Sequence, residues 1–284
     1  MGDAFSVRLP PVLWIGPTRF PGELALARAW ITGRAEVVDV ATPALAVAHP
    51  PAVICDRSPA AILLGSPATF SWSVRDCVTV SRRWPLAPLV SVAATLVEGR
   101  RRSGPALPGV EEVAWNELPG RLAWWLCDRA MGAPGTLGLP ATARREERLL
   151  EVSRRVADMR PRRPARVEVA APRAIDVESV ADLVTAAGHA VVGRRVGKPP
   201  IDHDADAVVW DAGNLESPQI AWTGLLAANR PRTAIVLLDS FPRAETAAAA
   251  TGAGASAVLS RPASLESLAG ILLDVTQRPA GSRG

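Results

Sequence analysis

Three charged residues follow apolar runs in the C-terminal half of the sequence, and their chemistry is that of an ion-paired cluster. Asp211 and Asp239 each end an apolar run, and Arg261 closes a later one. If these runs are parallel strands, their carboxyl ends lie at one edge of a sheet, where α/β proteins place their functional residues. A guanidinium pairs strongly with carboxylates, so we expect Arg261 to be a permanent partner of both aspartates.

The elements around these residues repeat one order along the chain. Between residues 166 and 275, apolar strands alternate with amphipathic helices, which predicts a doubly wound parallel sheet. Residues 11–131 repeat this order more faintly, and an internal duplication accounts for the repetition. We therefore predict an α/β protein of two flavodoxin-like, five-stranded units joined by a helical linker. The expected boundaries are 1–131 for the first unit, 132–165 for the Gly/Pro-rich boundary and linker helix, and 166–284 for the second unit with a short disordered tail.

The C-terminal segment resembles the receiver domain of bacterial response regulators, and the resemblance covers residues 166–275. Asp211 stands where receivers carry the aspartate that is phosphorylated. Arg261 and Pro262 resemble the Lys-Pro pair that follows the fifth strand of the family, and Asp239 stands where receivers have Ser or Thr. The resemblance implies a receiver fold with Asp211 at the phosphoacceptor position.

The departures from the family concern the metal site. Ala170 and Ala171 stand where receivers have the acids that bind the metal ion. Mg²⁺ requires several oxygen ligands, and phosphoryl transfer requires a cation to neutralise the charge on the transferred oxygens. We therefore expect no phosphorylation, no metal and no cofactor. Mg²⁺ would be needed only if Asp211 is phosphorylated after all.

The N-terminal half resembles a second receiver domain that has lost more of the family motif. The strand expected to be its third ends at Asp56, which would then hold the phosphoacceptor position of this half. Ala94 replaces the hydroxyl residue, and Asn116 replaces the lysine. The acids of the metal site are absent as well, since Gly16 and Pro17 stand in their places.

Two further segments are candidates for binding a partner. The irregular stretch at 98–109 replaces a helix on the usual signalling face of receivers, and we expect it to expose an interaction loop for an acidic protein or for phosphate groups, formed by Arg100, Arg101 and Arg102. The helix expected at 141–160 carries a heptad-like apolar seam, which would dock on a receiver-like unit or form a homodimer.

Several functional classes are disfavoured by the sequence. It contains no basic and apolar leader and no run of about 18 apolar residues, so we expect a cytoplasmic protein without a membrane partner. Its three cysteines lie far apart and form no zinc or disulfide pattern. No pattern of a catalytic triad or of a phosphate-binding glycine loop is present, so we do not expect an enzyme.

We interpret the chain as a non-catalytic, receiver-like (pseudo-receiver) interaction module in bacterial signal transduction or regulation, with an unidentified protein partner. One alternative is a working phosphorelay receiver that is phosphorylated on Asp211. A second alternative is a nucleic-acid-associated regulator that uses the Arg-rich loop and the linker, although no helix-turn-helix, finger or RNP motif accompanies these basic residues.

Overall fold

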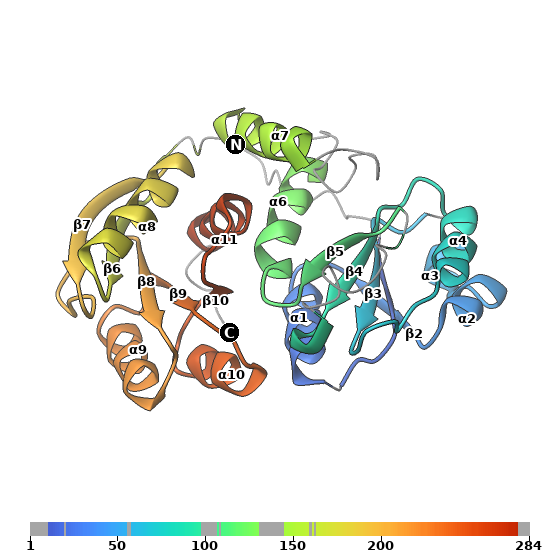
Figure 1. Cartoon of the computed structure of the whole chain (residues 1–284), viewed down its shortest axis with the longest axis horizontal. Coiled ribbons are helices and arrows are strands. Elements are labelled where there is room, and N and C mark those ends of the chain that lie inside the picture. Colours follow the sequence, from blue (N-terminus) through green and yellow to red (C-terminus); the bar gives the residue numbers. More distant parts are fainter. Residues whose placement is uncertain are drawn as a thin grey trace. The chain divides into compact units, whose positions relative to one another are not determined.

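The computed structural model describes residues 11–19, 21–55, 58–97, 107, 109–130, 145–158, 161 and 163–277. Contacts along the chain divide it into two compact units. The first comprises Met1–Leu118 and Trp125–Arg148, and the second comprises Pro119–Trp124 and Leu149–Gly284. Each unit contains one parallel five-stranded sheet with flanking helices (Figure 1). Among the described helices, none combines the length and the apolarity that are needed to cross a membrane.

The sheet of the first unit has the strand order β2-β1-β3-β4-β5, and all its pairings are parallel. This is the doubly wound, flavodoxin-like arrangement that the sequence predicts. The central strands have apolar side chains on both faces because helices cover both sides of such a sheet. Its strands are β1 (Val12–Ile15), β2 (Val37–Val40), β3 (Ile62–Ser66), β4 (Leu89–Ala93) and β5 (Glu111–Ala114).

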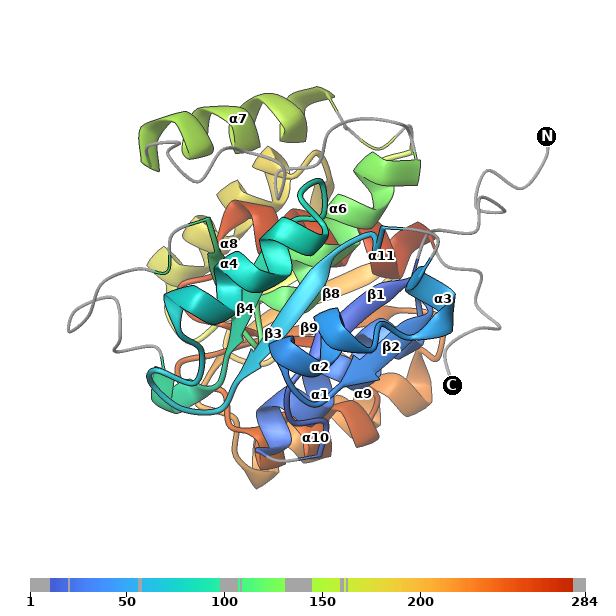
Figure 2. The ribbon, with the colours of Figure 1, turned by 90° about the vertical axis from the view of Figure 1, so that its right-hand side faces the viewer.

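Three helices of the first unit, α2, α3 and α4, cover one face of this sheet (Figure 2). The Thr42 side chain caps the first of them by accepting the Leu45 N–H at 3.2 Å, and Ser73 and Asp76 form a capping box at the start of α4. The helices of this half are α1 (Gly22–Thr32), α2 (Pro43–Ala48), α3 (Ala52–Cys55), α4 (Val74–Arg83) and α6 (Leu118–Ala130), with a 3-10 turn η1 at Thr95–Val97.

The predicted third strand of the first unit was wrong. Residues Ala52–Cys55 form the short helix α3, and the third strand is Ile62–Ser66. Because β3 ends at Ser66, this residue holds the strand-end position that was predicted for Asp56. Asp56 itself lies outside the described residues. The reason is that a short apolar run has no periodicity that separates a strand from a helical turn. Tertiary packing makes the choice: every residue of β3 is buried, whereas Ala52, Val53 and Cys55 face solvent.

The sheet of the second unit has the equivalent order β10-β9-β8-β6-β7, again with parallel pairings. A difference from the first unit lies between β7 and β8, where the described residues 197–206 form a connection without a helix. The strands are β6 (Arg166–Ala171), β7 (Ala190–Val196), β8 (Ala207–Gly213), β9 (Ala234–Asp239) and β10 (Ala257–Ser260), and the helices are α7 (Arg145–Asp158), α8 (Ala174–Ala186), α9 (Ser217–Asn229), α10 (Ala244–Gly252) and α11 (Leu265–Gln277).

Candidate functional site

Asp211 lies near the carboxyl end of β8 and is almost fully buried, with 1% of its surface exposed. Its Oδ1 atom accepts the Gly213 N–H at 3.0 Å, and its Oδ2 atom lies 3.2 Å from Arg261 Nε. Burial raises the pKa of the Asp211 carboxyl, because the charged form loses its hydration, while the Gly213 N–H and the Arg261 charge act in the opposite direction. The carboxylate is therefore held by one backbone donor and one fixed cation.

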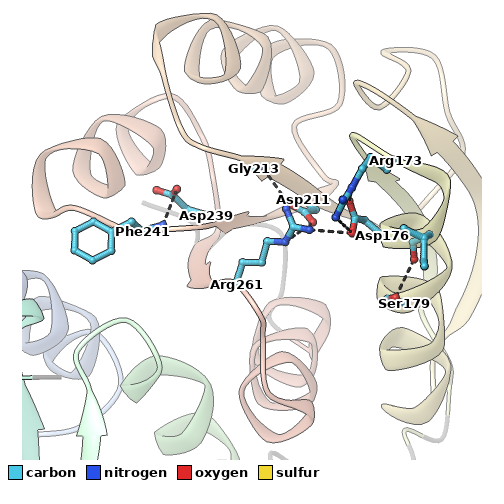
Figure 3. A network of polar contacts seen from close by, with 9 residues as sticks. Arg173, Asp176, Ser179, Asp211, Gly213, Asp239, Phe241 and Arg261 are labelled. Atoms are coloured by element: carbon cyan, nitrogen blue, oxygen red, sulfur yellow. Dashed lines mark hydrogen bonds and ion pairs between the residues drawn. The ribbon is translucent and has the colours of Figure 1, made fainter. Parts of the chain in front are cut away.

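Arg261 follows β10 and connects two carboxylates that come from different elements (Figure 3). Besides Asp211, it contacts Asp176 in the first turn of α8, where Arg261 Nη2 donates to Asp176 Oδ1 at 2.9 Å. Arg173, the N-cap residue of α8, donates to the same carboxylate through Nε at 2.7 Å and through Nη2 at 2.8 Å. We call Arg173, Asp176, Asp211 and Arg261 the Arg261 cluster.

The two arginines hold Asp176 in its charged form. Hydrogen bonds from Arg173, and then the charge of Arg261, lower the pKa of the Asp176 carboxyl below its usual value. The position in the first turn of α8 also favours a negative charge, because backbone N–H groups point outward at a helix N-terminus. The Arg261 cluster has two cations and two carboxylates, so its formal charge is zero.

The predicted ion pair between Arg261 and Asp239 is wrong. The described side-chain partners of Arg261 are Asp176 and Asp211, and only the backbone N–H of Arg261 bonds to the Asp239 carbonyl, at 2.8 Å. The Asp239 carboxylate instead accepts the N–H groups of Leu215 and Phe241, each at 3.3 Å. Figure 3 shows Asp239 on the opposite side of the Arg261 guanidinium from Asp176.

The different partners of Asp239 and Arg261 have a physical reason. Asp239 ends β9, and its short side chain reaches the two loops that follow β8 and β9, where it joins their backbones. Arg261 has a longer side chain that extends past β9 to β8 and α8. The sequence shows no direct sign of Asp176 as a partner, although its three-residue spacing from Arg173 at the start of a helix permits an i,i+3 ion pair.

The chemistry available to this site is charge pairing. Ala170 and Ala171 are fully buried at the end of β6 and offer no oxygen ligand from their side chains. Within the part of the chain that the structure describes, no three or more His, Cys, Asp or Glu residues are grouped so as to hold a metal ion. The guanidinium of Arg261 supplies the positive charge beside Asp211, and it ties β8, β10 and α8 together.

The strand registers place the equivalent positions of the first unit. The first pairs between the central strands are Leu13 with Ile62 in one sheet and Val167 with Ala207 in the other. Four residues further along the third strand of each sheet, Ser66 corresponds to Asp211. The same count along the first strands matches Gly16 with Ala170 and Pro17 with Ala171. Along the fourth strands, Ala94 corresponds to Asp239. After the fifth strands, Asn116 corresponds to Arg261.

The strand ends of the first unit are neutral and are covered by an indole ring. Ser66 is fully buried, and its hydroxyl lies 2.8 Å from that of Ser91. Trp72 donates through Nε1 to the Gly65 carbonyl at 3.1 Å. A Cβ on Gly16, whose φ is +118°, would lie 3.0 Å from the Trp72 ring. This position therefore holds a neutral serine instead of a carboxylate, and the Trp72 ring packs closely beside Gly16.

Two of the predicted binding segments are described only in part. Arg100, Arg101 and Arg102 lie outside the described residues, so the interaction loop stays a prediction. The linker helix forms over Arg145–Asp158 as α7. Of the apolar seam predicted there, Leu149, Val152, Val156 and Met159, the side chain of Val156 is buried and that of Val152 is partly buried. The side chains of the other two lie outside the part of the chain that the structure describes.

No family model matches the chain, and no curated protein matches it. Solved structures similar to it include a Burkholderia thailandensis protein described as a pilus assembly protein (cpaE), which is 23% identical over 40% of this chain and 98% of that chain, with a TM-score of 0.37. The E. coli RcsC C-terminus, with a linker region and phosphoreceiver domain, is 13% identical over 98% of this chain and 97% of that chain, with a TM-score of 0.36.

A response regulator protein from Burkholderia pseudomallei with a phosphorylated aspartic acid is 18% identical over 36% of this chain and 63% of that chain, with a TM-score of 0.31. At identities and TM-scores of this size, we rest the fold assignment on the strand order of the two sheets themselves.

Proposed function

We propose that this chain is a non-catalytic, receiver-like interaction module of signal transduction. The observation that carries the proposal is Arg261, which stands where receivers have a lysine and contacts both Asp211 and Asp176. The ion pair neutralises the phosphoacceptor position without a phosphoryl group or a metal ion. The two flavodoxin-like sheets support the receiver-like part of the proposal.

The surroundings of Asp211 oppose phosphorylation on three counts. Its nucleophilic carboxylate is 98% buried and already bonded, so an incoming phosphoryl group would have to displace Arg261. The alanines at the end of β6 provide no ligand for the Mg²⁺ that phosphoryl transfer needs. Asp239 stands where receivers have a hydroxyl, and its carboxylate, already bonded to the N–H groups of Leu215 and Phe241, offers no hydroxyl donor to a phosphoryl group.

The test of this part is direct phosphorylation of the full chain. Wild type and Asp211→Asn would be incubated with acetyl phosphate and Mg²⁺, and their intact masses measured by mass spectrometry. An active receiver treated in the same way is the positive control. We expect no added phosphate on wild type or on Asp211→Asn. A hydroxylamine-labile phosphate on wild type that is missing from Asp211→Asn would overturn the proposal and establish the phosphorelay alternative.

The interaction part of the proposal predicts that partner binding does not depend on the phosphodonor. The same proteins should be captured from the source lysate by wild type, by wild type with acetyl phosphate, and by Asp211→Asn, because none of these conditions changes the signalling state. Capture that appears only with the phosphodonor would contradict this. Recovery of bulk nucleic acid, lost at moderate salt, would instead support a nucleic-acid-associated regulator.

A further inference from the structure

Helix α4 of the first unit carries exposed arginines beside exposed valines. Arg75, Val78 and Arg82 follow one another at steps of three and four residues, which places them on one side of the helix. The opposite side of α4 buries Cys77 and Val80 in the core with the strands. The stripe therefore faces away from the sheet, and Figure 2 shows α4 among the helices in front of the strands.

The apolar part of this surface is small. Val74 is 50% exposed and Val78 is 39% exposed, and the two lie one turn apart. Helix α2, which packs beside α4, adds Leu45 at 47%. Exposed apolar residues are common on protein surfaces, so these three do not identify a partner without the charges beside them. We call the set the α4 face: Leu45, Val74, Arg75, Val78, Arg82 and Arg83.

The arginines of α4 differ from many others in the chain. Arg75, Arg82 and Arg83 are exposed, and none of the three forms an ion pair within the part of the chain that the structure describes. Arginines on other helices, such as Arg28 and Arg155, are paired with acids of this chain. An exposed guanidinium can hold a carboxylate of another molecule through two parallel hydrogen bonds.

The charge balance of α4 favours an acidic partner. Three arginines and one acid, Asp76, give the helix three positive charges and one negative charge, a formal charge of +2. Asp76 is already engaged, because its Oδ2 atom accepts the Ser73 N–H at 2.9 Å and the Ser73 hydroxyl at 2.7 Å. The neighbouring helices α2 and α3 contain no acid that could offset the arginines.

Two other kinds of anionic surface fit the α4 face less well. Helices that lie in a membrane interface insert bulky Trp, Phe or Leu side chains, whereas α4 offers valines that are already half buried. Interfaces with nucleic acid are strongly polar, whereas Val78 lies within the stripe between Arg75 and Arg82. Arginine beside partly exposed apolar side chains is typical of the contact between two proteins.

We propose that the α4 face binds an acidic, amphipathic segment of a partner protein. Carboxylates of this segment pair with the three arginines, and its apolar side chains cover Val74 and Val78. Arg75 and Arg82 are seven residues apart, about 10.5 Å along the helix, so carboxylates two turns apart on a partner helix reach both. The proposal rests on the interaction part of the proposed function and adds the surface and the chemistry of the partner. It uses no residue of the Arg261 cluster.

A synthetic peptide tests the chemistry of the partner. The probe is a fluorescently labelled helical peptide with leucines on one side and glutamates beside them, and the control peptide has glutamine in place of every glutamate. Fluorescence anisotropy with the full chain should show the glutamate peptide binding about tenfold more tightly than the glutamine peptide, with an affinity that falls as salt is added. Absence of binding, or equal affinity for the two peptides, would overturn the proposal.

Two charge reversals test whether the peptide binds on α4. Arg75→Glu and Arg82→Glu should each weaken binding of the glutamate peptide by about tenfold. A negative charge is favourable in the first turn of a helix and unfavourable in the last, so a loss shared by both variants does not come from unfolding of α4. Arg163→Glu, at an exposed arginine of the second unit, is the matched control and should bind as wild type does. An equal loss in Arg163→Glu would overturn the proposal.

The remaining outcomes separate this proposal from the proposed function. If Arg75→Glu captures the same lysate proteins as wild type, the α4 face is not the binding surface, and the interaction module stands without it. If wild type captures no protein, the interaction module itself fails. Wild type that ignores the glutamate peptide but adsorbs to phosphatidylserine vesicles, or retains a DNA duplex, would overturn the proposal and assign the α4 face to that surface.

Discussion

Replacing Arg261 with alanine should destabilise the second unit locally, because it leaves the buried Asp211 carboxylate without its cation. Removal of one partner of a fully buried ion pair costs about 3–5 kcal/mol. Two features reduce this figure here. The Arg261 side chain is 29% exposed, so solvent screens part of the interaction, and Asp211 keeps the Gly213 N–H. We therefore expect Arg261→Ala to cost about 1–3 kcal/mol near neutral pH.

The pH dependence of this loss follows from the pKa of Asp211. Burial already raises this pKa, and removal of Arg261 raises it further, since a stabilising positive charge disappears. A folded-state pKa above the unfolded value means that the folded protein takes up the proton more readily as the pH falls. The neutral carboxyl needs no cation, so the cost of Arg261→Ala should shrink as the pH is lowered from neutral toward the pKa of Asp211.

Hydrogen exchange followed by mass spectrometry is the suitable assay, because it reads the free energy of opening separately for each element of a chain with two units. The amides of β8 and β10 should exchange faster in Arg261→Ala than in wild type. Arg173→Ala is the matched control: its side chain is 67% exposed, so we expect a much smaller change in the exchange of β8 and β10 than for Arg261→Ala. Adding Asp211→Asn to Arg261→Ala should recover part of the loss.

The reasoning would be refuted if Arg261→Ala and Arg173→Ala had equal effects on β8, or if the effect of Arg261→Ala did not change from neutral pH down to the lowest pH at which wild type stays folded. Either result would show that the pairing with Asp211 does not stabilise this edge of the sheet.

Three further predictions concern other positions. Gly193→Ala should lower the free energy of unfolding by about 1–3 kcal/mol in chemical denaturation, because a Cβ there would lie 1.7 Å from Glu168 Oε2. If the double variant with Glu168→Ala is no more stable than Gly193→Ala, this clash is not the cause. Burial lowers the pKa of His189 from 6.5, and its Nδ1 accepts the Ala165 N–H at 3.2 Å. The free energy of unfolding that is present above about pH 6.5 is then lost as the pH falls. His189→Asn should make the free energy of unfolding depend less on pH in this range, and an equal pH dependence in variant and wild type would refute the prediction. Ser73→Ala removes the cap of α4 and should cost about 1 kcal/mol, seen as faster exchange of α4 amides with α9 unchanged.

The parts of the fold that could be predicted are those in which local pattern and burial agree. Strands β8 and β9 read as continuous apolar runs because both faces of a doubly wound sheet are covered. The predicted end of β9 at Asp239 is confirmed, whereas β8 continues past Asp211 to Gly213. The third strand of the first unit could not be placed, because Ala52–Cys55 and Ile62–Ser66 are both short apolar runs without a distinguishing period. Only packing against β1 and β4 selects the second run.

The candidate site likewise has features that the sequence determined and features that only the tertiary structure decided. The sequence by itself determined that Asp211 lies near the end of a central strand, that two alanines end β6, and that a cation follows β10, because these are properties of residue type and order. The partners of that cation were decided by the tertiary structure. Asp176 is separated from Arg261 by 85 residues. Only the packing of α8 against β6 and β8, within reach of a long side chain that starts after β10, brings the two side chains together. Which carboxylate a long arginine side chain reaches depends on distances between elements, and no local pattern in the sequence encodes them.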